Sequence, residues 1–195
     1  ERTVFNTYSA ALTDVFLNCK LITCGTGRYL QCDTSIFKRK IFNPWAEFDD
    51  SDISSDAPKI RTDNLKKYLL NQKNAKYILI AESPSLGARY SGIAMTSEKV
   101  INANNLSYKF SSKKSESGKY IYELTAKKVW DEIIEKKENF VMWNAFAYNI
   151  HEKEGRWFEN PTEEELKGNL KLLNSFLSLY SGAKIITIGK TAQNA

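Results

Sequence analysis

The feature that most constrains how this chain can fold is a set of unbroken apolar runs separated by helical patterns. The runs cover residues 77–81, 140–143 and 184–189. Strands that helices cover on both faces need such runs, whereas strands with one solvent-exposed face alternate between apolar and polar residues. Helical apolar spacing is found between the runs, over residues 125–137 and 162–180. Strands that alternate with helices predict a parallel sheet with right-handed crossovers.

The whole chain is predicted to form one domain, since 195 residues suit a single hydrophobic core. We expect residues 1–42 to form an N-terminal helix and lead-in, and residues 43–195 to form the core. A further helix is expected from Arg61 to Gln72, capped by Thr62 or Asp63.

Two polar segments are predicted to be exposed connections. Residues 43–58 are bracketed by prolines and contain four aspartates, but no glycine sits where a calcium-binding loop turns. We therefore expect a solvated surface loop there. Residues 102–118 are rich in Asn, Ser and Lys, which is typical of an exposed connection. Their basic and aromatic side chains also suit contact with a nucleic-acid strand.

Composition indicates the compartment, the bound groups and the partners to expect for this chain. The three cysteines, Cys19, Cys24 and Cys32, make a poor disulfide framework and predict a reducing, cytoplasmic compartment. Neither their spacing nor the single His151 completes a metal site, so we expect no metal and no cofactor. The apolar runs fall far short of the ~20 residues that a membrane span needs. A net charge of +5 is compatible with DNA as a partner.

Candidate functional residues follow the first two apolar runs, because ligands of open α/β sheets bind beyond the carboxyl ends of the strands. Pro84 holds Ser83 extended, so Glu82 leaves its strand in a fixed direction as a candidate base. Asn144 ends the second run, and its amide offers a hydrogen-bond donor and acceptor side by side. This pair is complementary to the edge of uracil and not to that of cytosine, whose donor and acceptor are reversed. Structural alternatives remain for both side chains: Glu82 as an acceptor for a neighbouring loop or helix, and Asn144 as a tie within its own loop.

Taken together, these segments resemble the uracil-DNA glycosylase superfamily. Its first motif, a strand ending in Gly-Glu-Ala-Pro-Gly followed by Gly-x-Pro-Phe, is similar to residues 81–85 and 92–95. Further matching segments follow in the family's order from residue 96 to residue 193; they are Thr96–Glu98, Val129–Trp130, Trp143–Phe146, Pro161–Leu166 and Ile188–Gln193.

The resemblance implies a three-layer α/β/α sandwich with a central, mostly parallel, four-stranded sheet. It also implies a monomeric enzyme that flips uracil from DNA and hydrolyses its N-glycosidic bond in base-excision repair. The site residues that it implies fall into three groups: Glu82 and Ser83 for catalysis; Asn144, Met95, Ser85 and Gly92 for binding the base; and Arg89 and Tyr90 for contact with DNA.

Two departures from the family pattern keep other functions open. Met95 stands where the family usually has the phenylalanine that stacks on the base, and methionine stacks less strictly. The family's last motif, a histidine-containing loop, has no counterpart before Ala195, so we expect the C-terminal end of the domain to be missing from the sequence. The alternatives are a catalytically degraded nucleic-acid-binding module of the same fold and an α/β enzyme that acts on a free nucleotide.

Overall fold

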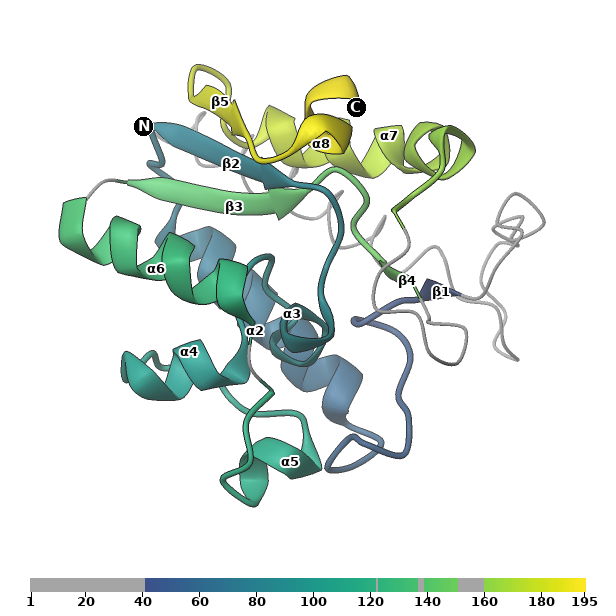
Figure 1. The fold of residues 1–195 in the computed structure, drawn as a ribbon, viewed down its shortest axis with the longest axis vertical. Helices are drawn as coiled ribbons and strands as arrows, with labels where there is room; N and C mark the ends of the chain where they lie inside the picture. Colours follow the sequence, from purple (N-terminus) through teal and green to yellow (C-terminus); the bar gives the residue numbers. More distant parts are fainter. Residues whose placement is uncertain (1–40, 122, 137–138, 151–159) are drawn as a thin grey trace, which may run out of the picture.

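The computed structural model describes residues 41–121, 123–136, 139–150 and 160–195 (Figure 1). The helix expected near the N-terminus, the three cysteines and His151 lie outside these residues. The described elements, in chain order, are β1 (Ile41–Phe42), α2 (Ala57–Asn71), β2 (Tyr77–Ala81), α3 (Leu86–Ser91), α4 (Glu98–Ala103), α5 (Lys113–Glu116), α6 (Leu124–Lys136), β3 (Phe140–Asn144), β4 (Asn149–Ile150), α7 (Glu163–Ser178), β5 (Lys184–Thr187) and α8 (Lys190–Asn194).

The three apolar runs form one parallel sheet, as the sequence predicts. Strand β2 lies in the centre, and it pairs in parallel with β3 on one side and β5 on the other. Strands β1 and β4 form a separate antiparallel pair. A fourth strand of the main sheet is not found among the described residues. That strand was implied only by the family resemblance, since the sequence itself contains three apolar runs.

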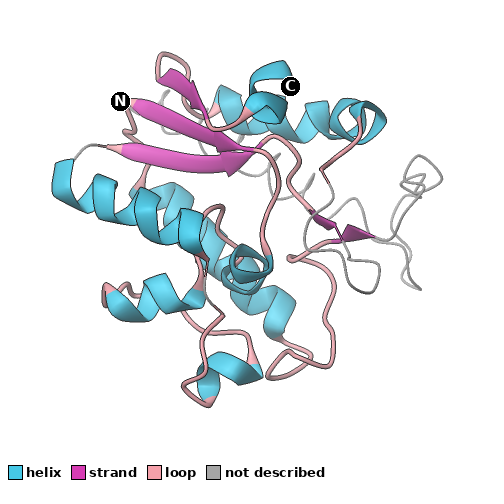
Figure 2. Cartoon of the chain, in the orientation of Figure 1, coloured by secondary structure: helices cyan, strands magenta, loops and turns pink. Residues whose placement is uncertain are grey.

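Helices flank the sheet from both sides, with α6 below it and α7 and α8 above it in the view of Figures 1 and 2. Trp143 of β3 stacks on Phe176 of α7, with ring centroids 4.5 Å apart and planes 9° apart. On α6, the Trp130 indole N–H donates to the hydroxyl of Thr96 at 3.0 Å. Strand β5 is the exception to this cover, because all of its residues are exposed, including Ile185 and Ile186.

Helix starts match the sequence prediction where a side chain caps the backbone. Thr162 and Glu165 form the expected capping box at the start of α7. The start predicted for α2 is wrong, because the helix begins at Ala57 and its N-cap is Asp56. Proline is favoured in the first helical turn, and Pro58 occupies it here. The Thr62 hydroxyl instead donates to the Pro58 carbonyl within the helix, at 2.8 Å.

The segment over residues 43–58 is anchored to the core, so the expectation of a solvated loop is wrong. Arg61 of α2 is fully buried, and a buried guanidinium needs a full set of hydrogen-bond acceptors. The segment supplies them: Arg61 donates to the Asp52 carboxylate at 2.6 Å, to the Pro44 carbonyl at 2.5 Å and to the Glu47 carbonyl at 2.6 Å. Asp52 of this segment therefore serves as an internal counterion.

The segment over residues 102–118 is also held more firmly than the sequence predicts. The Glu98 carboxylate accepts hydrogen bonds from the hydroxyls of Ser112 and Ser115 and from the Ser111 backbone N–H. All four residues are buried. The serines that make the segment look like a polar linker are thus the donors that bind it to α4.

Burial raises the pKa of Glu98, against the opposing effect of its serine hydrogen bonds. In the unfolded chain, glutamate ionises near its ordinary pKa of about 4.3, so the unfolded state releases its proton first. The free energy of unfolding should therefore fall as the pH rises from that value through the raised pKa of the folded state. We expect a shallower fall in Glu98→Gln, measured by urea denaturation at a series of pH values. Equal pH dependence in the two proteins would show that Glu98 folds in its charged form at no penalty.

Candidate base-binding site

The segments that follow β2 and β3 run together at the carboxyl end of the sheet. Register places Ala81 opposite Asn144. Beyond that pair, the Ala145 N–H donates to the Ala81 carbonyl at 2.8 Å, and the Phe146 N–H donates to the Glu82 carbonyl at 2.9 Å. Glu82 and Asn144 therefore emerge at the same edge of the sheet, as expected for residues at the ends of neighbouring parallel strands.

Two buried asparagines hold these segments in place. Asn149 donates from its amide to the Pro84 carbonyl at 2.9 Å, which links the segment after β3 to the segment after β2. Asn169 of α7 donates to the Ala145 carbonyl at 2.5 Å and accepts from the Ala147 N–H at 3.4 Å. Sequence reasoning missed both residues. The signal for Asn169 was a polar residue on the face that α7 turns to the core.

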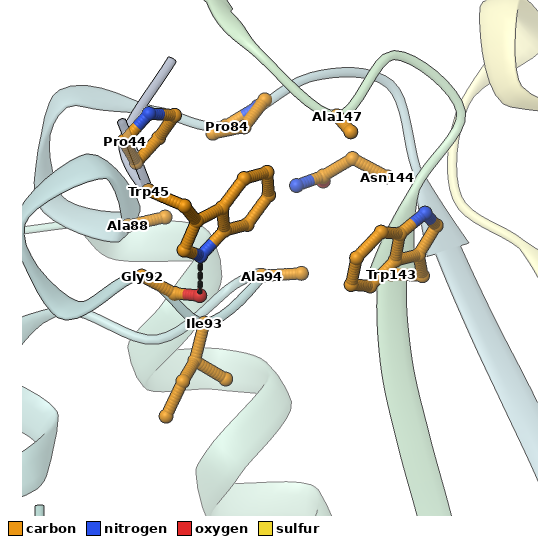
Figure 3. A pocket seen from close by; sticks show the side chains of 10 residues that line it. All are labelled: Pro44, Trp45, Pro84, Ala88, Gly92, Ile93, Ala94, Trp143, Asn144 and Ala147. Atoms are coloured by element: carbon orange, nitrogen blue, oxygen red, sulfur yellow. Dashed lines mark hydrogen bonds between the residues drawn. The ribbon is translucent and has the colours of Figure 1, made fainter. Parts of the chain in front are cut away.

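A small pocket lies between these segments and the anchored segment over residues 43–58 (Figure 3). Its free volume is about 10 Å³, which is about what one water molecule requires. The residues that line it are Pro44, Trp45, Pro84, Ala88, Gly92, Ile93, Ala94, Trp143, Asn144 and Ala147.

Two buried oxygens at this edge accept no hydrogen bond from any described residue. They are Oε1 of Glu82 and Oδ1 of Asn144. Buried polar atoms in folded proteins nearly always have a partner, so each exception needs an explanation, such as a catalytic role or a bound water. The structural alternative for Asn144 has little support, because Asn149 and Asn169 tie the loops together instead. Asn144 lines the pocket, and its side-chain amide lies beside Trp45 (Figure 3).

The other residues predicted to bind the base or act in catalysis take different places. Ser83 is half-buried, next to Glu82. The Ser85 hydroxyl caps α3 by accepting from the Ala88 N–H at 3.2 Å. Gly92 lines the pocket and has a φ of 74°, a left-handed conformation that favours glycine. Met95 is buried and lies outside the set of residues that line the pocket, so this geometry gives no support to its expected stacking role.

The two residues predicted to contact DNA lie below the surface. Arg89 is 3% exposed, forms an ion pair with Asp49, and places its guanidinium carbon 3.5 Å from the centre of the Phe42 ring. Tyr90 is also buried, and its carbonyl accepts from the Ser111 hydroxyl at 2.7 Å. These partners indicate a structural role for both residues.

The part of the chain that the structure describes contains neither a candidate metal site nor a membrane-spanning helix. Those residues contain no group of three or more His, Cys, Asp or Glu side chains that could hold a metal ion. Among the helices of the same part, none is both long enough and apolar enough to cross a membrane.

The structure is similar to the crystal structure of Pedobacter heparinus SMUG2, with a TM-score of 0.54 and 14% sequence identity. The match covers 94% of this chain and 78% of that chain. No protein-family model matches the sequence, and no curated protein matches it either. At this level of identity, the similarity shows that the two proteins share a fold.

Proposed function

We propose that this protein is a uracil-DNA glycosylase-like enzyme, which flips uracil out of DNA and hydrolyses its N-glycosidic bond. The observation that carries the proposal is the pair of unpartnered acceptors on Glu82 and Asn144, both of which follow from strands that end at the carboxyl edge of the sheet. Both stand at matching positions in the superfamily motifs. The fold shared with SMUG2, a protein of the uracil-DNA glycosylase family, supports the same superfamily.

Asn144 is assigned to recognition of the base. Its free Oδ1 accepts from N3–H of uracil, and its amide N–H donates to O4. Cytosine presents the reverse pattern, with an acceptor at N3 and a donor at N4, so both contacts become repulsive. A buried amide therefore discriminates between these bases with little help from solvent.

Glu82 is assigned to activation of the water molecule that attacks the sugar. The carboxylate takes a proton from a water molecule, whose oxygen forms a bond to C1′ of the sugar as the bond from C1′ to N1 of uracil breaks. The electron pair of that bond leaves with the base, which then takes up a proton. Ser83 is next to Glu82 in the chain, and we assign its hydroxyl to holding the same water. The reaction needs no cofactor.

The direct test is cleavage of an oligonucleotide with a single uracil by the full-length protein, with the resulting abasic site detected by alkaline strand scission. Uracil release supports the proposal. Salt-sensitive binding to DNA without release would contradict it and would favour the alternative, a nucleic-acid-binding module of the same fold. The specific observation in favour of that alternative is the small free volume of the pocket.

Replacing Asn144 with alanine should weaken recognition of uracil. The lost pair of hydrogen bonds carries ~1–3 kcal/mol of discrimination, which is about a 5-fold to 150-fold loss of preference for uracil over cytosine. Single-turnover cleavage of oligonucleotides that differ only in that base measures the ratio. Asn74→Ala is the matched control, because Asn74 is exposed and precedes β2, at the opposite end of the sheet. An unchanged ratio in Asn144→Ala would remove Asn144 from recognition.

A further inference from the structure

The side chain of Trp45 fills the pocket in front of Asn144. Trp45 is 7% exposed, and its indole N–H donates to the Gly92 carbonyl at 3.0 Å (Figure 3). Pockets for small ligands usually enclose ~300–1,000 Å³. With about 10 Å³ left free, this pocket holds no nucleic-acid base while the indole is in place.

The indole rests on a rigid aromatic platform. Its plane is 1° from that of Trp143, with centroids 6.0 Å apart, which is an offset stack. Phe176 of α7 packs against Trp143, with ring centroids 4.5 Å apart. A flat ring is therefore already bound here, with Trp143 beside it and the Asn144 amide at its edge (Figure 3).

We infer that the Trp45 indole occupies the position of the substrate base, and that the base enters by displacing it and stacking on Trp143. This inference rests on the proposed function and adds to it: Trp143 becomes the stacking surface that the family resemblance implied for Met95, and Trp45 becomes a specificity-determining residue.

The exchange has a defined driving force. The indole uses its N–H on Gly92 and leaves Oδ1 of Asn144 unpaired. An unpaired buried acceptor is unfavourable, so a ring that stacks equally well and also donates to Asn144 has the advantage. A ring that only stacks gains nothing over the indole. Trp45 therefore selects for bases that satisfy Asn144, which uracil does through N3–H.

The movement is confined to the side chain, because the backbone around Trp45 is held. The carbonyls of Pro44, just before Trp45, and Glu47, two residues after it, accept from the buried Arg61, and the Trp45 N–H donates to the Asn43 side chain at 3.0 Å. The open state is a minor conformer of the free protein. Only this fraction of the molecules can bind a base, so the observed dissociation constant equals that of the open state divided by the fraction.

The test compares binding of free uracil to wild-type protein and to Trp45→Ala by isothermal titration calorimetry. We expect at least about a 10-fold gain in affinity when the indole is removed, since the open state no longer has to be populated. The gain should vanish with 3-methyluracil, which lacks the N3–H donor. Phe48→Ala is the control, because Phe48 lies on the same segment and is 61% exposed. Equal affinity in wild type and Trp45→Ala, or an equal gain with 3-methyluracil, would overturn the inference.

A second measurement guards against a variant that folds poorly. Trp45→Phe keeps an aromatic ring but loses the hydrogen bond to Gly92, so it should show a smaller gain in uracil affinity. In wild-type protein labelled with 5-fluorotryptophan, the Trp45 resonance, assigned by its absence from Trp45→Phe, should shift when a uracil-containing single strand is added. A fixed Trp45 resonance under saturation would also overturn the inference.

The outcomes separate this inference from the proposed function. If Trp45→Ala gains affinity for uracil but no form of the protein releases uracil from DNA, the base does replace Trp45 and the catalytic proposal fails. If wild type releases uracil while removal of the indole leaves uracil binding unchanged, the catalytic proposal stands and the displacement of Trp45 is wrong.

Discussion

Replacing Glu82 with glutamine is expected to slow release of uracil by ~10²-fold or more while leaving DNA binding nearly intact. Glutamine keeps the shape of the side chain and its hydrogen-bonding capacity, but it cannot take a proton from water. Glu82 begins the rigid segment after β2, and its carbonyl accepts from Phe146, so the substitution should not move the backbone. The rate loss should therefore appear in the chemical step.

The measurement is single-turnover cleavage of an oligonucleotide with one uracil, with binding measured separately by fluorescence anisotropy. Glu116→Gln provides a matched control, because Glu116 is exposed on α5 and makes the same change of charge. If Glu82→Gln releases uracil at the wild-type rate, the carboxylate is not the base. Glu82 would then be an acceptor for a neighbouring group, the structural role that its position in the sequence also allows.

Replacing Arg61 with methionine is expected to lower the free energy of unfolding by ~3–5 kcal/mol. The guanidinium and the Asp52 carboxylate are 0% and 1% exposed, so removal of the cation leaves a buried charge without a counterion. The carbonyls of Pro44 and Glu47 lose their donor at the same time. The segment that carries Trp45 should loosen, and with it the wall of the pocket.

Urea denaturation measures this loss, and two further variants define its origin. In Arg61→Met combined with Asp52→Asn, part of the stability should return, because the uncompensated charge is gone. Lys59→Met is the control for an exposed pair, since Lys59 and Asp63 lie 2.6 Å apart but both face solvent, and its effect should be small. A loss from Arg61→Met no larger than that from Lys59→Met would mean that the buried pair adds nothing to the fold.

Local sequence patterns determined the strands, their parallel arrangement and the edge of the sheet where the candidate site lies. An unbroken apolar run is typical of a strand that is covered on both faces, as β2 and β3 are, whereas the exposed β5 keeps the parallel pairing without that cover. The capping box of Thr162 and Glu165 is equally local, because both partners lie within one helical turn. Once the strands are parallel, Glu82 and Asn144 must emerge at the same edge, whatever the intervening chain does.

Only the tertiary structure decided which distant side chains complete that edge. The hydrogen bond from Trp45 to Gly92 joins residues 47 positions apart, and no periodicity reports such a pairing. The same holds for Arg61, whose acceptors turned a stretch rich in aspartate into a buried wall, and for Arg89, which pairs with Asp49 below the surface. A residue's polarity indicates that it needs a partner, but the fold determines whether that partner is water, DNA or another part of the chain.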